Sequence, residues 1–133
     1  MRPIKQQHKS GCGIAAIATV AKEPYKVVLR MMHPNYKRKK KFFTNWNGIR
    51  GGLDIMGVGY GKLRRTPGKS AADIAKIAKE NKTVYIIGAA EKTHQKNWHY
   101  LVVSKTGKVY DPYHGKAVNP SGYQVIRSIL EIE

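Results

Sequence analysis

Residues 10–21 read SGCGIAAIATVA, and this stretch decides how the rest of the chain folds. From Ile14 to Ala21 the only residue that is not apolar is Thr19, and alanine has the highest helix propensity of all residues. Ser10 is a favourable N-cap residue. A helix that is apolar nearly all round must be surrounded by other elements. We therefore predict a helix that begins near Cys12 and lies buried in the middle of the domain.

The residues outward from this helix predict further helices and then strands. The helical patterns are Tyr25 to about His33 after Pro24, a short helix over 45–56, and a helix capped by Ser70 whose apolar face is Ala71, Ile74, Ala75 and Ala78. The β-rich runs are 84–87, 98–104, 108–110 and 123–132, with a hairpin turn at 105–107 and at most one strand in 57–68. Helices followed by strands favour an α+β fold with a C-terminal antiparallel sheet.

Length and composition restrict the class of protein. The 133 residues suit one domain spanning 1–133. A single cysteine excludes an intramolecular disulfide and a zinc site built from several thiolates. The longest apolar stretch, 13–21, is shorter than the ~20 residues of a membrane span. This stretch follows basic residues, as the apolar part of a secretory signal does, but it is diluted with alanine. We therefore expect a cytoplasmic protein without an integral membrane segment.

Cys12 is the first candidate for chemistry. It stands at the predicted start of the buried helix, where free backbone N–H groups and the helix dipole favour a thiolate. Gly11 and Gly13 leave its sulfur accessible. The alternative is that Cys12 is a small buried hydrophobe, which is the commoner role of a free cysteine.

His99 and Asp111 are the candidate partners of that thiol. His99 begins the apolar strand 98–103, and a strand holds an imidazole rigidly. The next strand ends at Asp111, within about three positions of the residue opposite His99 in a short hairpin. A carboxylate there would orient the imidazole and stabilise its cation. The alternatives are a structural histidine and a turn aspartate before Pro112.

Gln6 is the candidate oxyanion donor. A side-chain amide six residues before Cys12 could join the Cys12 backbone N–H in binding a negatively charged oxygen. Spacing alone does not distinguish Gln6 from its neighbour Gln7.

Taken in chain order, these segments resemble a papain-like cysteine peptidase. The resemblance rests on Gln6, residues 10–16 (SGCGIAA), residues 99–103 (HYLVV) and residues 109–112 (VYDP), and it is greatest to the double-glycine, bacteriocin-processing peptidases and their stand-alone relatives. It implies a papain-like fold, no cofactor, and a bacterial or phage source. It also implies that Cys12 is the nucleophile, His99 the general base and acid, Asp111 its orienting group and Gln6 an oxyanion donor. That family commonly carries an acidic residue just before the nucleophile, where this chain has Gly11.

The charge predicts an anionic partner. The chain has 25 Lys and Arg against 8 Asp and Glu, a net charge of +17. Five consecutive cations stand between Tyr36 and the pair Phe42–Phe43, and they are the candidate residues for binding nucleic acid or an acidic partner: Lys37, Arg38, Lys39, Lys40 and Lys41. Such runs attract phosphate, and flanking aromatics can stack on bases, whereas a solvated loop is the alternative.

The sequence therefore predicts a thiol hydrolase that cleaves an amide bond of a peptide or protein substrate, and its positive charge would steer an acidic substrate. Two alternatives stay open: a basic nucleic-acid-binding module on a catalytically idle papain-like scaffold, and a thiol amidase or acyltransferase on a non-peptide substrate. No metal is expected, because His94 and His99 are five residues apart with no acidic residue between them.

Overall fold

A computed structural model describes residues 1–91, 94–123 and 125–133, with the side chains of these except 90–91, 94–97 and 125. One six-stranded sheet, in the order β1-β6-β2-β3-β4-β5, forms the centre of the fold, and the pairs of neighbouring strands are antiparallel. The strands are β1 (Tyr60–Arg65), β2 (Val84–Glu91), β3 (His94–Val103), β4 (Val109–Asp111), β5 (Lys116–Val118) and β6 (Val125–Ile132).

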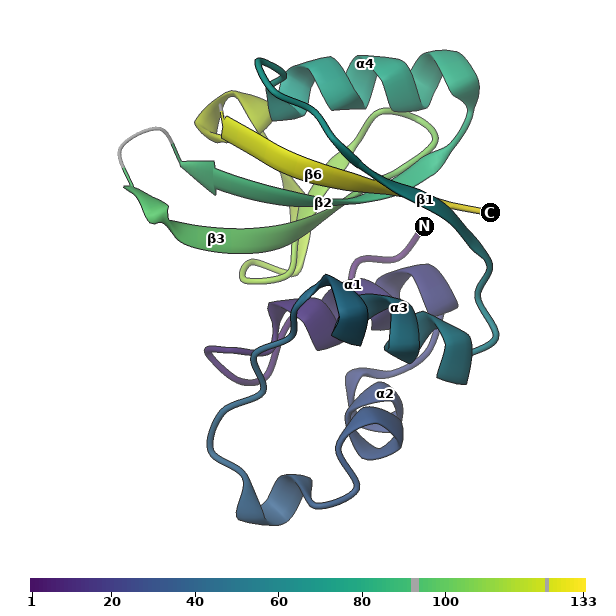
Figure 1. Cartoon of the computed structure of the whole chain (residues 1–133), viewed down its shortest axis with the longest axis vertical. Helices are drawn as coiled ribbons and strands as arrows, with labels where there is room; N and C mark the ends of the chain where they lie inside the picture. Colours follow the sequence, from purple (N-terminus) through teal and green to yellow (C-terminus); the bar gives the residue numbers. More distant parts are fainter. Residues whose placement is uncertain (92–93, 124) are drawn as a thin grey trace.

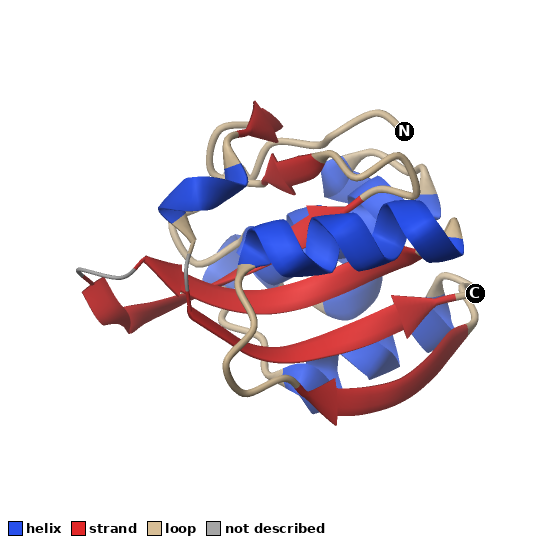
Figure 2. Ribbon diagram, turned by 90° about the horizontal axis from the view of Figure 1, so that it is seen from above, coloured by secondary structure: helices blue, strands red, loops and turns tan. Residues whose placement is uncertain are grey.

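Helices cover both faces of this sheet. On one face lie α1 (Cys12–Ala21), α2 (Tyr25–Met32) and α3 (Trp46–Ile55), and on the other lies α4 (Ala71–Asn81) (Figure 1). Seen from above, α4 lies in front of the sheet, roughly along its long strands, with the other helices behind the sheet (Figure 2). Two single-turn 3₁₀ helices, η1 (Tyr36–Arg38) and η2 (Pro120–Gly122), lie in the connections. The mixed fold of helices and an antiparallel sheet agrees with the prediction.

Alternating side chains divide the core into two layers. Ile86 and Val102 pack among the residues of α1, α2 and α3, whereas Ile87, Leu101 and Val103 pack under α4. This alternation follows from the two-residue period of a strand. The described part of the chain holds no helix long and apolar enough to cross a bilayer.

The central helix forms where predicted, with a different cap. Residues 14–18 of α1 are completely buried. The apolar stretch 13–21, which follows basic residues as in a secretory signal, therefore lies within the central helix of the core. Its N-cap is Gly11 without a side-chain hydrogen bond, and the prediction that Ser10 caps it is wrong. The Ser10 hydroxyl instead accepts the backbone N–H of Phe42 at 2.7 Å. That buried N–H needs an acceptor, and Ser10 supplies it, which ties the loop after α2 to the start of α1.

The order of elements differs from a simple run of helices and then strands. Strand β1 precedes α4, and its partner is the last strand, β6, which lies between β1 and β2. The predicted helix over 45–56 is α3, with Asn45 accepting the N–H of Gly48, and Ser70 forms a capping box with Asp73 at the start of α4. Gln124, inside the predicted run 123–132, lies outside the described residues.

Candidate active site

The thiol of Cys12 lies at the first residue of α1, where this helix packs against β3. The backbone N–H groups of Gly13 and Tyr100 donate to its sulfur, and it shares a hydrogen bond with His99. Burial raises the pKa of this thiol, but the hydrogen bond and charge of His99, together with the two N–H groups, hold the pKa below its ordinary value. The side chain is partly exposed. These contacts favour an accessible thiolate.

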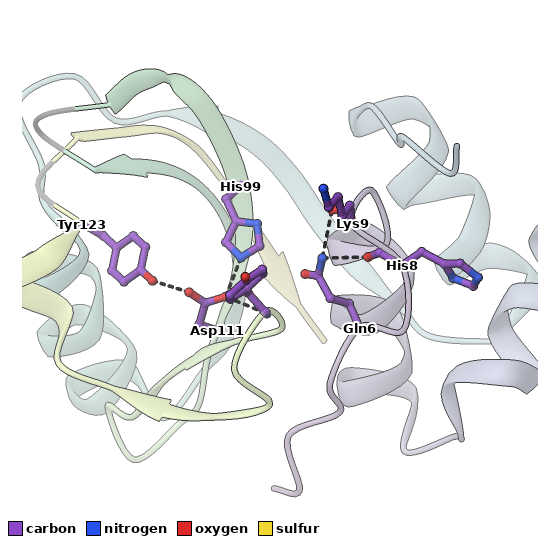
Figure 3. A network of polar contacts seen from close by, with 7 residues as sticks. Gln6, His8, Lys9, His99, Asp111 and Tyr123 are labelled. Carbon is purple, nitrogen blue, oxygen red and sulfur yellow. Dashed lines mark hydrogen bonds and ion pairs between the residues drawn. The ribbon is translucent and has the colours of Figure 1, made fainter. Parts of the chain in front are cut away.

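The imidazole of His99 joins this thiol to a carboxylate. Its Nε2 lies 2.5 Å from Oδ1 of Asp111, the last residue of β4 (Figure 3). The register explains the contact: Val102 pairs with Tyr110, so Asp111 follows opposite Leu101, two residues from His99 on the same face. Because Nε2 is bound to Asp111, Nδ1 is the nitrogen that serves Cys12.

The two partners shift each other's charge states. Burial lowers the pKa of His99, but hydrogen bonds to Asp111 and Cys12 outweigh burial and raise it to about 9. Burial raises the pKa of Asp111, but His99, the Tyr123 hydroxyl and the Tyr113 N–H hold it below its ordinary value. The directions of these shifts favour the charged form of each side chain: a thiolate, an imidazolium and a carboxylate.

Sequence reasoning missed the residues that hold Asp111. Its Oδ1 also accepts the N–H of Tyr113 at 2.8 Å, and its Oδ2 accepts the hydroxyl of Tyr123 (Figure 3). Tyr123 comes directly after η2, and no local pattern connects it with a carboxylate twelve residues earlier. The carboxylate is almost completely buried, at 4% side-chain exposure, so these donors matter for its ionised form.

Gln6 lies beside the site but uses its amide elsewhere. It is buried, whereas Gln7 is exposed, and its backbone N–H donates to the carbonyl of Pro112. Its Nε2 donates to the carbonyls of His8 and Lys9 at 2.8 and 3.0 Å (Figure 3). A side-chain amide has two N–H hydrogens, so both are engaged in closing this turn. Oxyanion binding by Gln6 stays a prediction that requires one of these bonds to open.

The glycine before the nucleophile has a steric cause. A Cβ on Gly11 would lie 2.1 Å from the hydroxyl oxygen of Tyr25. That hydroxyl is hydrogen-bonded to Nδ1 of His8 at 2.9 Å, and the Tyr25 side chain is buried. The tyrosine thus fills the space that an acidic side chain at position 11 would need.

We expect Gly11→Ala to destabilise the fold by about 1–3 kcal/mol, because the Tyr25 ring must move in a packed core. Chemical denaturation measures this loss, and in a Tyr25→Phe background it should be smaller, since the clashing oxygen is gone. Gly51→Ala is the control: nothing lies within 4 Å of a Cβ there. Equal losses in both backgrounds would show that Tyr25 is not the obstacle.

A pocket of about 530 Å³ adjoins His99. It is lined by residues of β1, β2, β6, the middle of β3 and the start of α3. Two tryptophans and three arginines are among its lining residues: Trp46, Trp98, Arg64, Arg65 and Arg127. This pocket was not predicted, because its walls come from five separate elements: β1, β2, β3, β6 and α3.

The basic run is exposed on the loop between α2 and α3. The side chains of Lys37, Arg38, Lys39, Lys40 and Lys41 all face solvent. Of the flanking aromatics, Phe42 cannot stack on a base, because it is 1% exposed and its ring packs against His8 and His33. Phe43 is 76% exposed and is available. Binding of an anionic partner by this run stays a prediction.

No metal centre is found in the described part of the chain, where no group of three His, Cys, Asp or Glu side chains gathers. The side chain of His94 lies outside the described set.

Comparisons with known proteins agree with the architecture. No protein-family model and no curated protein sequence matches the chain. Among solved structures, it is similar to the peptidase domain of Streptococcus ComA, described as a bifunctional ABC transporter involved in a quorum-sensing pathway. The TM-score is 0.62 at 17% identity, over 99% of this chain and 96% of that one. The chain therefore shares the fold of that peptidase domain.

Proposed function

We propose that this protein is a papain-like thiol hydrolase that cleaves an amide bond of a peptide or protein. The observation that carries the proposal is the hydrogen-bonded series of Asp111, His99 and Cys12, with the sulfur at the N-terminus of a buried helix. This series supplies a nucleophile, a base that serves it and a group that orients the base. The fold shared with a peptidase domain supports the same reaction class.

The proposed reaction has two halves. The Cys12 thiolate attacks the carbonyl carbon, and the backbone N–H of Cys12, which has no acceptor within the first helical turn, faces the developing oxyanion. The carbon–nitrogen bond breaks as Nδ1–H of His99 gives its proton to the leaving amine, and an acyl-thioester stays on Cys12. Neutral His99 then takes a proton from water, the hydroxide displaces the thiolate, and the acid product leaves with the ion pair restored.

The charge states predict a bell-shaped pH profile for kcat/KM. On the acid side, activity falls as the thiolate is protonated, and this occurs with a pKa below the ~8.5 of an ordinary cysteine. On the alkaline side it falls near pH 9, where His99 loses the proton that it must donate. The rate at which iodoacetamide alkylates Cys12 should rise over the same pH range as the acid limb of the activity profile. The His99→Ala substitution should move this limb to higher pH. A single alkylation step with a pKa of ~8.5, the same in the wild-type protein and in His99→Ala, would contradict the ion pair.

Mapping of new peptide termini tests the reaction itself. A proteome-derived peptide library is incubated with the wild-type protein and with Cys12→Ala, and the products are identified by mass spectrometry. Cysteine-dependent new termini are expected. Acyl-enzyme in the intact mass spectrum without new peptide termini would favour an amidase or acyltransferase on another substrate.

A further inference from the structure

The pocket beside His99 combines cations with an aromatic wall. Arg64 and Arg65 come from β1, Arg127 comes from β6, and all three side chains are exposed. The guanidinium of Arg127 lies 5.2 Å from the ring centre of Trp98, which belongs to β3 beside His99. Residues distant in the sequence are therefore brought to one side of the imidazole.

The part of the lining that Trp46 forms is held in place by packing. The ring of Trp46 lies against Gly88, where a Cβ would come within 3.3 Å of it. Trp46 also meets Tyr100 edge-on at 5.0 Å, and the Tyr100 hydroxyl donates to the carbonyl of Thr44 at 2.8 Å. An aromatic wall fixed in this way offers a preformed surface for the apolar stem of a ligand.

The positive charge of this pocket is uncompensated within the described part of the chain. None of the described residues that line it is acidic, and none of the described carboxylates forms an ion pair with Arg64, Arg65 or Arg127. Arg65 stands opposite Ser128, which also lines the pocket, and cationic side chains gathered at one pocket repel each other, so a bound anion relieves that repulsion. Arginine also presents paired N–H donors that match the two oxygens of a carboxylate.

We propose that this pocket is a substrate subsite that takes an acidic residue near the bond to be cleaved; this rests on the function proposed above. The carboxylate would meet the arginines while its methylene stem lies on Trp46 or Trp98. The volume, about 530 Å³, suits one or two residues of a peptide. A nucleic-acid strand needs a longer track of cations, which the pocket does not provide.

Tryptophan fluorescence tests this subsite without any catalytic step. The chain has two tryptophans, and both line the pocket. The Cys12→Ala protein is titrated at low salt with Ac-Ala-Glu-Glu-Ala-NH₂ and with its Gln-Gln analogue. We expect the glutamate peptide to bind at least about tenfold more tightly, and the preference to fall as salt is added, because exposed charges are screened.

Substitutions of the pocket arginines test whether the pocket causes the preference for the glutamate peptide. Arg65→Gln with Arg127→Gln should reduce the preference to less than about threefold; Arg65 is chosen because it shares a face of β1 with Leu63 and pairs with Ser128, both in the pocket lining. The control is Lys105→Gln, which removes one exposed cation in the turn after β3, outside the lining of the pocket. This control should keep the full preference.

Three results would overturn the subsite: equal affinities for the two peptides, a preference that survives the loss of both arginines, or saturation of the signal by an oligothymidylate but not by the acidic peptide. An acidic preference in a protein whose Cys12 proves unreactive would refute the hydrolase and leave the binding site standing.

Discussion

Replacing Cys12 by alanine is expected to lower kcat for peptide hydrolysis by at least about 10⁴-fold, and His99→Ala should lower it by a similar factor. The chain has a single cysteine, so no second thiol can take over. Without His99 the thiol loses both its hydrogen-bond partner and the proton donor for the leaving amine. The double variant should be no slower than the worse single variant, because the two groups act as one unit.

Steady-state kinetics on a peptide from the library measures these losses, and circular dichroism checks that each variant is folded. His114→Ala is the matched control: this histidine is exposed, and its ring contacts that of Tyr113. It should keep nearly full activity. More than a hundredth of the activity left in folded Cys12→Ala would exclude Cys12 as the nucleophile.

Substitutions of Asp111 should divide its role into geometry and charge. Asp111→Asn keeps an oxygen for Nε2–H of His99 and the N–H of Tyr113, and its new amide N–H can donate to the Tyr123 hydroxyl. The negative charge is lost, so the pKa of His99 falls from about 9. We expect a loss of about 10- to 100-fold in kcat/KM, with the alkaline limb moved to lower pH.

Asp111→Ala should be far worse. It removes the acceptor of the His99 imidazole and of the Tyr113 backbone N–H, and it frees the imidazole to rotate. We expect a loss of about 10³-fold or more in kcat/KM and of about 2–3 kcal/mol in the free energy of unfolding. The pH profile and chemical denaturation separate the two variants. Equal kinetics and equal pH profiles for the Asn and Ala variants would contradict an orienting role for the carboxylate.

Local sequence was enough for most of the secondary structure. The apolar run that becomes α1, the Ser70 cap, and the turn at 105–107 all depend on residues within a few positions of each other, and such signals can be read along the chain. The contact of His99 with Asp111 belongs to the same class, because a short hairpin restricts which residues can face each other.

Other features depended on contacts between distant segments. Ser10 has the local pattern of a cap, yet a buried N–H 32 residues away takes its hydroxyl. Gln6 has the spacing of an oxyanion donor, yet two carbonyls of its own turn hold its amide. Periodicity indicates which residues are apolar or polar, but it does not indicate which partner a polar group finds.

The sequence by itself determined the buried central helix, the α+β class and a cysteine, histidine and aspartate in a usable order. Only the tertiary structure decided that β6 pairs with β1, that Tyr123 supports Asp111, and that three arginines line one pocket beside His99. Helix formation and short turns follow from interactions between near neighbours in the chain, whereas strand order and pocket walls are decided by the burial of surfaces that meet after the chain has collapsed.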